Sequence, residues 1–555
     1  MPNACQRGVR YAALFLPILF LLVFFFYPLG AILVHSLRLS DMPALPDVGY
    51  TLRLLWFTTW QATVSTLLTL AVGLPAAYAF ARYRFPGKSL LQALTTVPFV
   101  MPTLIVATAF LALIGPNGVL NAIAMRLFRL SRPPFDLQHT IWIILIAHVF
   151  YNYSVVVRVV GSFWSHLNPR LEEAARTLGA NRWQAWWEVT LPQLMPAVAA
   201  AALLIFVFCF TSFGVIMILG GPRFATIEVE IYRQAAHLLN LPLAAILSLL
   251  QTGLAFAIMS AYTALQRRTA RPLDYRSRQV AQKSPRTWRA RLWIAANVIW
   301  MIALLLTPLG ALVWRSITLG GGLTLRYYAA LSVDPGRSIF FAPPLLAIRN
   351  SLIFAMATVV LSLCLGTLGA YLLTNRDALM RRVIAWLDPL LVLPLGISAV
   401  TLGFGYIIAF NRRPLNWITS PFLVPVAHAL IAFPFVLRSV LPALRGIRPS
   451  IREAAATLGS TPVRVWWAID LPLIARSLAV GAVYAFTISI GEFGATLLIA
   501  RTEYATIPVV IYRYLAQPGV MNLGQALAMS ALLMGICAVS FVLIERFRVG
   551  KVGSF

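Results

Sequence analysis

The chain has 555 residues, of which 60% are hydrophobic and only 11% are charged, and its mean hydropathy is +0.81. A soluble globular chain has about a quarter of its residues charged, so the composition excludes that class. The net charge of +28 comes from basic residues clustered between apolar runs, which is typical of membrane proteins. No nucleic-acid-binding motif accompanies this charge, so we expect no nucleic-acid partner. The four cysteines are scattered and show neither disulfide nor metal spacing.

Twelve apolar stretches are long enough to cross a bilayer, which takes about 20 residues in a helix. Backbone groups inside lipid must be satisfied within the segment, so we read these stretches as helices. They are expected at residues 11–35, 57–81, 90–114, 139–161, 195–219, 241–265, 292–315, 348–374, 384–410, 420–441, 474–500 and 522–545. The sequence therefore predicts an all-α integral membrane protein with about twelve transmembrane helices.

The second half of the chain repeats the first. A segment beginning at Glu173 recurs at Glu453, an offset of 453 − 173 = 280, and no gap is needed between His148 and Arg233. The repeat divides the chain into a first unit at 1–265, a basic linker at 266–291 and a second unit at 292–555. Six helices per unit is an even number, so the two units enter the membrane from the same side and are parallel.

The basic segments predict the orientation. The linker carries many arginines and one acid, Asp274, and it falls on the same side as the segments at 82–88 and 376–382. By the positive-inside rule that side is cytoplasmic, and both termini lie there too. We expect a bacterial cytoplasmic (inner) membrane protein that crosses the membrane many times and contacts membrane lipids.

Each unit carries one polar loop between two apolar runs, at about 164–193 and 444–473. In the first loop a short helix-forming run meets Gly179, which suits the left-handed end of a helix. Asn181 and Thr461 are good N-caps for a second short helix, which carries a tryptophan pair. We expect Pro192 and its counterpart Pro472 to end that helix. Such a loop can simply pack on its own helices, but two equivalent loops facing one compartment also suit a partner with two equivalent subunits.

The two loops read "EAARTLGANRWQAWWEVTLP" and "EAAATLGSTPVRVWWAIDLP" and resemble the EAA signature of permease subunits of binding-protein-dependent ABC importers. The matching positions are Glu173, Ala174, Ala175, Gly179, Leu191, Pro192, Glu453, Ala454, Ala455, Gly459, Leu471 and Pro472. The resemblance implies a type I importer fold in which each loop couples to one ATPase subunit. It also implies two copies of that ATPase and an extracytoplasmic substrate-binding protein as partners.

The fused layout and segments such as "ISIGEFGATLLIARTEYATIPVVIYRY" are similar to the ferric-iron and thiamine branch of these permeases. The segment "RFPGKS" lacks the first glycine of a Walker A motif, because Arg82 stands at that position. We therefore expect no nucleotide, metal or other cofactor on this chain, and ATP is expected on a separate subunit.

Six residues are candidates for the pathway or its gate. They form three repeat-related pairs, Ser212 with Glu492, Phe213 with Phe493, and Tyr232 with Tyr512. Glu492 is the notable member, since a carboxylate in a spanning segment is costly and usually meets a cavity or a partner. It is either a structural or gating acceptor or a direct substrate contact. The histidines of the repeat, His148 and His428, are read as residues that hydrogen-bond between helices.

The sequence favours a permease of an ATP-driven importer, with no catalysis of its own, for a ferric-iron or thiamine type of solute. An acid with nearby tyrosines suits a cationic ring through cation–π attraction, although Arg233 and Arg513 beside the tyrosines would repel it. Permeases for polyamine, sulfate or molybdate stay open as alternatives. A secondary transporter driven by an ion gradient is the main rival, since two parallel six-helix units also suit it. A membrane enzyme is disfavoured, because no catalytic constellation is present.

Overall fold

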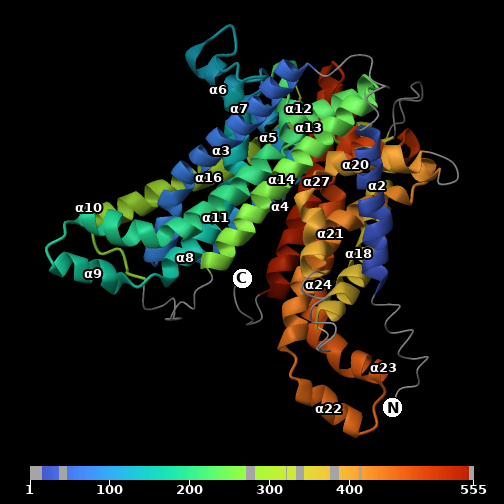
Figure 1. Ribbon diagram of the computed structural model, residues 1–555. Helices are drawn as coiled ribbons and strands as arrows, with labels where there is room; N and C mark the ends of the chain where they lie inside the picture. Colours follow the sequence, from blue (N-terminus) through green and yellow to red (C-terminus); the bar gives the residue numbers. More distant parts are fainter. Residues whose placement is uncertain are drawn as a thin grey trace. The chain divides into compact units, whose positions relative to one another are not determined.

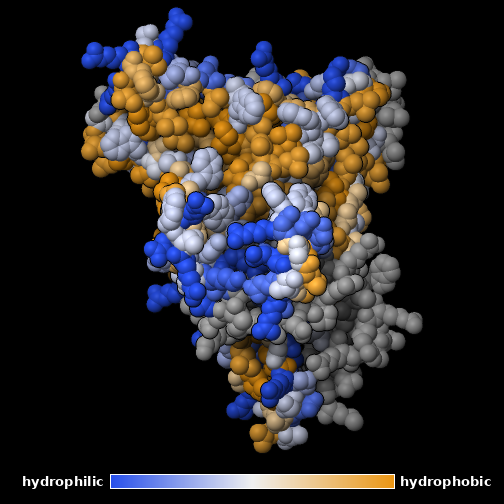
Figure 2. All heavy atoms as spheres, turned by 90° about the vertical axis from the view of Figure 1, so that its left-hand side faces the viewer, coloured by the Kyte–Doolittle hydropathy of each residue, from blue (hydrophilic) through white to orange (hydrophobic). Residues whose placement is uncertain are grey.

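The computed structural model describes residues 15–36, 47–269, 282–319, 322–332, 343–374, 387–411 and 416–548. Within these ranges, eleven helices are long and apolar enough to cross a membrane, and a bent pair of helices brings the number to twelve. The one sheet described is a two-stranded antiparallel hairpin, β1 with β2. On the face shown in Figure 2, hydrophobic residues fill most of the upper part, and hydrophilic residues gather below them. The predicted class, an all-α integral membrane protein, is confirmed.

The elements follow in chain order (Figure 1). The first repeat contains η1 (Leu22–Phe26), α2 (Tyr27–Ser36), α3 (Val48–Arg82), α4 (Lys88–Val100), α5 (Thr103–Ile114), α6 (Val119–Phe128), α7 (Ile141–Val155), η3 (Val156–Val160), α8 (Gly161–His166), α9 (Pro169–Thr177), α10 (Arg182–Gln184), η4 (Ala185–Thr190), α11 (Leu191–Phe210), α12 (Gly214–Leu219), η5 (Gly221–Arg223), α13 (Ile227–Tyr232), η6 (Arg233–His237) and α14 (Leu241–Thr269). The second repeat contains α16 (Trp288–Ser316), β1 (Thr318–Leu319), β2 (Gly322–Leu323), α17 (Arg326–Ala330), α18 (Pro344–Thr374), η7 (Leu393–Gly396), α20 (Ala399–Phe410), η8 (Trp417–Thr419), α21 (Leu423–Gly446), α22 (Pro449–Thr457), α23 (Pro462–Val465), η9 (Trp466–Asp470), α24 (Leu471–Gly491), α25 (Gly494–Ile499), η10 (Thr502–Tyr504), α26 (Ile507–Leu515) and α27 (Val520–Arg548).

The third helix of each repeat is broken, although the sequence predicted one continuous helix in each place. In the first repeat α4 and α5 are separated at Met101, whose backbone is extended because a proline, Pro102, follows it. In the second repeat the two helices Leu387–Gly396 and α20 meet at an angle of 99°. Ser398 caps α20 by accepting hydrogen bonds from the amides of Val400 and Thr401.

The fifth spanning helix of each repeat begins and ends earlier than predicted. It runs over Arg182–Phe210 in the first repeat and Pro462–Gly491 in the second, and a short helix follows each break. Pro192 and Pro472 do not end the helices that precede them, so that expectation was wrong. A π-helical turn, η4 or η9, leads directly into each proline-containing helix start, and this wider turn accommodates the residue that lacks an amide hydrogen.

The described helices form two compact units, and these do not coincide with the two sequence repeats. One unit contains residues 1–44, 231–249 and 326–555, and the other contains 45–230 and 250–325. The first helix, α2, packs on α20 of the second repeat, where a Cβ at Gly405 would lie 3.1 Å from that of Pro28. The first helix of the second repeat, α16, packs on α5 of the first. The repeat boundaries remain a division of the sequence, and residues 270–281 of the predicted linker lie outside the described residues.

Close helix contacts recur in both repeats. A Cβ at Gly73 of α3 would lie 2.7 Å from the side chain of Val156, and one at Gly366 of α18 would lie 2.7 Å from that of Val436. Val436 follows Val156 by the same 280 positions as the loops. Without a hydrophobic driving force in lipid, small residues of this kind let helices approach and pack. The shared contact shows that the repeats have the same internal packing.

Candidate coupling loops and pathway residues

The first polar loop is a helical hairpin at one end of its unit, with α6 at the opposite end (Figure 1). Gly179 has a φ of +96°, and Ala180 donates a backbone hydrogen bond to Ala175 across the end of α9. Gly179 itself donates to Arg176, which completes a Schellman motif. Asn181 then caps α10 in a reciprocal capping box with Gln184. The predicted turn and N-cap are confirmed.

The second polar loop has the same construction. Gly459 has a φ of +78°, and Ser460 donates a backbone hydrogen bond to Ala455. Thr461 caps α23 by accepting from the amide of Arg464, and Pro462 occupies the first turn of that helix. Among the described residues, no atom outside the neighbouring residues lies within 4 Å of a Cβ placed on either glycine. The backbone conformation, and not crowding, is therefore what requires glycine here.

Each loop exposes large apolar side chains. Leu178 is 90% exposed and Leu458 is 86% exposed, and Trp187 and Trp467 are also exposed. The other tryptophan of each predicted pair behaves differently, since Trp466 packs against the core of its unit. Each loop therefore exposes a leucine and a tryptophan together.

The charged members of the two loops differ. Glu173 pairs with Lys283 at 3.1 Å, which ties the described end of the linker segment to the first loop. Glu453 is exposed and makes no ion pair or hydrogen bond with the described part of the chain. Leu191 and Leu471, with the prolines that follow them, lie in the first turns of α11 and α24 and therefore behind the loop tips.

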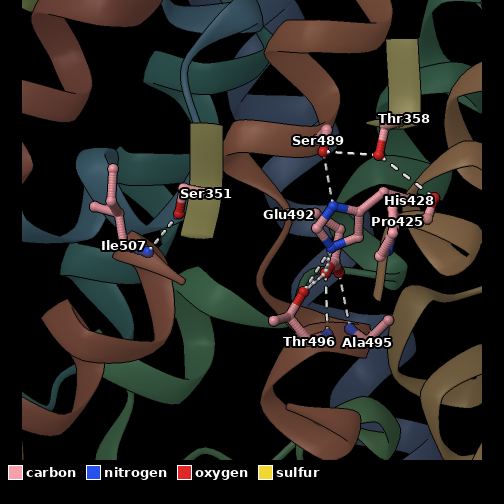
Figure 3. A network of polar contacts seen from close by, with 9 residues as sticks. All are labelled: Ser351, Thr358, Pro425, His428, Ser489, Glu492, Ala495, Thr496 and Ile507. Carbon is pink, nitrogen blue, oxygen red and sulfur yellow. Dashed lines mark hydrogen bonds and ion pairs between the residues drawn. The ribbon is translucent and has the colours of Figure 1, made fainter. Parts of the chain in front are cut away.

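Glu492 lies in the break between α24 and α25, where its carboxylate is buried (Figure 3). The amides of Ala495 and Thr496 donate to it at 2.8 and 3.0 Å, so it satisfies free amides at the start of α25. The hydroxyl of Thr496 also donates to it, and His428 Nε2 lies 3.2 Å from Oε2. The carboxylate thus has partners on both of its oxygens.

His428 connects this break to two further helices. Its Nδ1 lies 2.8 Å from Ser489 Oγ, and Ser489 in turn donates to Thr358 Oγ1 of α18 at 3.1 Å (Figure 3). The sequence analysis predicted an interhelical role for His428 but did not single out Ser489, Thr496 or Thr358. These serine and threonine residues lie inside apolar runs. Nothing in the sequence distinguishes them from serines and threonines that bond only within their own helix.

The first repeat has a neutral version of this arrangement. His148 Nε2 lies 3.0 Å from Ser212 Oγ, and its Nδ1 lies 2.9 Å from Ser65 Oγ. Ser212 stands where Glu492 stands in the second repeat. Two of the predicted pathway residues, Phe213 and Phe493, are buried beside these breaks. The expected asymmetry between the repeats is therefore present in the structure.

The two tyrosines named as candidates for the pathway or its gate form a pair. Tyr232 donates a hydrogen bond to Tyr512, and the Tyr512 ring lies 5.5 Å from that of Phe493. Burial raises the pKa of both tyrosines and lowers the pKa of Arg513. The structure therefore brings together one residue from each repeat at equivalent positions. In the described residues, no three histidine, cysteine or acidic side chains form a group that could hold a metal ion.

Residues 70–271 match the family model for the inner membrane component of binding-protein-dependent transport systems. The matched range contains the whole of the first loop, and the second loop lies 280 positions farther on. Similar proteins extend over nearly the whole chain. The chain is therefore similar to permease proteins of binding-protein-dependent transport systems over nearly its whole length.

Three relatives illustrate the extent of the similarity. The thiamine transport system permease protein ThiP of Escherichia coli is 24% identical over 91% of both chains. The protein of the same name in Haemophilus influenzae is 25% identical over 98% of this chain and 97% of its own. A probable ABC transporter permease protein, y4fN, of Sinorhizobium fredii is 25% identical over 96% and 94%. All three relatives carry the name of a transport permease protein.

Proposed function

We propose that this permease passes a thiamine-type organic cation from an extracytoplasmic binding protein to the cytoplasm. The observation that carries the proposal is the similarity to thiamine permeases over nine-tenths or more of the chain. Ferric iron, which the sequence analysis named jointly with thiamine, has no such support among these relatives. Glu492 is held by several protein donors, so we assign it to the break and not to the substrate.

The two polar loops are proposed to couple the permease to two separate ATPase subunits. In each loop, the first short helix is followed by an exposed leucine and then a left-handed glycine. The chain therefore presents two copies of one docking surface. A partner with two identical subunits matches two equivalent surfaces. ATP binding and hydrolysis in these subunits would drive alternating access, and the permease would need no cofactor of its own.

We place the loops, the linker and both termini in the cytoplasm of a bacterial cell, with the helices in its inner membrane. Two backbone hydrogen bonds join Lys283 to Arg82 and Arg84, and its side chain pairs with Glu173. These contacts put basic residues beside the first loop, which is the cytoplasmic side by the positive-inside rule. A cysteine at Leu178 should therefore be labelled by a membrane-impermeant reagent only from the inner side of sealed vesicles.

Reconstitution tests the function directly. Proteoliposomes that contain the permease, the ATPase and the binding protein should accumulate labelled thiamine only when ATP is supplied to the ATPase. A variant ATPase that binds ATP but does not hydrolyse it is the matched control. Uptake driven by a proton or sodium gradient without the ATPase would establish the secondary transporter instead. Tight binding of a ferric complex, polyamine, sulfate or molybdate by the cognate binding protein, and not of thiamine, would replace the substrate.

A further inference from the structure

A cavity of about 430 Å³ lies behind the first loop, among α3, α8, α9, η4 and α16. Its volume is in the range of small-molecule sites. Four spanning helices begin or end at this level, so the cavity lies where an aromatic belt and lipid headgroups meet a membrane protein. Its polar and aromatic lining consists of Tyr78, Arg82, Trp164, Glu172, Trp186 and Trp293.

The matching place in the second repeat is filled by the protein itself. Arg452 donates from Nε to Asp470 Oδ1 at 2.8 Å, and its guanidinium lies 5.9 Å from the centre of the Tyr371 ring. The hydroxyl of Tyr371 donates to Asp470, and its ring lies 5.1 Å from that of Trp466. In the second repeat, the protein itself therefore supplies a cation over an aromatic ring, Arg452 over Tyr371, and an anion, Asp470.

The first repeat keeps the aromatic residues and lacks this bridge. The same offset of 280 places Glu172 where the second repeat has its arginine and Thr190 where it has its aspartate. Tyr78 in "GLPAAY" stands where Tyr371 stands in "GTLGAY". No described residue of the first repeat therefore stands over the Tyr78 ring as Arg452 stands over the Tyr371 ring, and the cavity lies there instead.

The side chains around the cavity are complementary to a ligand that carries one positive and one negative charge. The Tyr78 ring lies 5.1 Å from that of Trp164 and 5.5 Å from that of Trp293, so aromatic faces gather on one side. A cationic amine is attracted to the face of such rings. Glu172, with a side chain 36% exposed, supplies a negative charge nearby.

The same cavity offers donors for an anion. Arg82 has a side chain only 13% exposed, and its guanidinium lies 3.5 Å from Glu172, which is long for a charged hydrogen bond. Trp164 is 4% exposed, and its buried Nε1–H has no acceptor among the described residues. A buried donor without an acceptor is unfavourable, so an acceptor from a ligand would stabilise this site.

We propose that this cavity binds a phosphate ester that carries an amine, the chemistry of a phosphatidylethanolamine or phosphatidylcholine headgroup. The phosphate would accept from Arg82 and Trp164, and the amine would lie against the aromatic rings and Glu172. An occupied cavity braces the first loop from behind, as the Arg452–Asp470 bridge braces the second. Binding itself does not depend on the proposed transport function, although its effect on coupling does.

Native mass spectrometry of the purified full-length permease tests the proposal, with phosphatidylethanolamine, phosphatidylcholine and phosphatidylglycerol supplied in turn. We expect one amine-bearing lipid to be retained, with retention about tenfold weaker in Arg82→Gln, since charged hydrogen bonds contribute about 1.5 kcal/mol or more. Arg53→Gln, at the other end of α3, is the matched control and should retain the lipid. A photoactivatable phosphatidylethanolamine should label the peptide containing Trp293 or Trp186.

The experiment distinguishes a lipid headgroup from a soluble phosphate ester as the ligand. Displacement of the lipid by soluble phosphoethanolamine supports the site and shows that a free phosphate ester also enters it. Equal retention of phosphatidylglycerol would overturn the role of the amine. Equal retention by Arg82→Gln and wild type, or labelling confined to other peptides, would overturn the site. None of these readouts requires transport, so failure here leaves the proposed function standing.

Discussion

His428 Nε2 lies 3.2 Å from Glu492 Oε2 inside the membrane-spanning part of the second repeat, and both side chains are buried. The first repeat has a histidine and a serine at these positions, so the same polar link has a carboxylate in one repeat and a hydroxyl in the other. A buried pair is costly to break, because removal of one partner leaves the other without compensation. The pair therefore holds the break between α24 and α25 in place.

Replacement of this carboxylate is expected to affect folding more than substrate affinity. Glu492→Leu should destabilise the protein by about 3 to 5 kcal/mol, because His428 and two backbone amides lose their acceptor. Glu492→Gln keeps an acceptor oxygen and should be milder, with a lower maximal transport rate and KM changed by less than about twofold. The measurements are thermal unfolding in detergent and ATP-driven uptake. Ser212→Ala, at the matching site, should cost only about 1 kcal/mol. A large rise in KM with unchanged stability would instead identify Glu492 as a substrate contact.

The glycines of the two loops should be replaceable only by residues that tolerate a positive φ. Gly179→Val and Gly459→Val are expected to distort the loops at a cost of about 1 to 2 kcal/mol each, since L residues are strained in this conformation. Copurification of the ATPase should fall and transport should be lost. Gly179→Asn is the matched control, because asparagine enters the left-handed region more easily. If both valine variants bind the ATPase as wild type does, the docking assignment fails.

The exposed leucines should act one per ATPase subunit. Leu178→Glu and Leu458→Glu replace an apolar contact by a charge at an interface, which is expected to cost about 2 kcal/mol or more of binding free energy. Each single variant should retain one ATPase subunit and the double variant none, as measured by the mass of the purified complex. Leu178→Met keeps the apolar contact and serves as control. Loss of both subunits from each single variant would show that the two loops do not dock independently.

The phenols of the tyrosine pair are expected not to titrate in the pH range in which transport is measured. Burial raises the pKa of Tyr232 and Tyr512 above their ordinary value of 10, so both phenols stay protonated at any pH below that value. Uptake measured from pH 6 to 9 should therefore have the same pH profile in wild type and in Tyr512→Phe. The variant should still transport more slowly if the hydrogen bond between the two rings closes the pathway. A pH profile that flattens in this variant would contradict the prediction.

The glycine contacts between helices can be tested by a second substitution. Gly366→Ala places a Cβ 2.7 Å from Val436, which should destabilise the second repeat by about 1 to 3 kcal/mol. Val436→Ala in the same chain removes the obstructing methyl groups and should restore part of this loss. At Gly73 the nearest atom is the Cβ of Val156, 2.7 Å away, which alanine keeps, so Gly73→Ala with Val156→Ala should restore less of the loss. Additive destabilisation in the double variants would show that these residues do not press on one another. Thermal unfolding of the purified chain measures all four cases.

The sequence predicted most of what depends on local signals. Hydropathy located the spanning helices because lipid requires a long apolar run, and Gly179 with Asn181 defined the hairpin because each has one preferred backbone role. The breaks at Met101 and Ile397 were missed, since apolar residues continue across them and hide the change of direction. Proline misled at Pro192, because a π-helical turn before it lets the helix continue.

The rest depended on contacts between residues far apart in the chain. Glu492 was noticed as an unusual charge, but its donors on α25 and its histidine on α21 are visible only in the folded chain. The pairing of Tyr232 with Tyr512 likewise joins positions separated by a whole repeat. The bridge between Arg452 and Asp470 was missed because each residue alone reads as an ordinary loop charge. Pattern analysis along one sequence does not report such distances.

The exchange of first helices between the repeats has a consequence for biosynthesis. While the chain is being translated, α2 is made long before α20, the helix on which it packs. It therefore lacks its packing partner until most of the chain has been made. The unit around α3 and α5 likewise remains incomplete until the ribosome has passed Ser316. A polypeptide released at residue 265 would therefore carry one helix without its partner and leave another site unfilled. The two halves have to be present in the same membrane at the same time, and their fusion in one polypeptide ensures this.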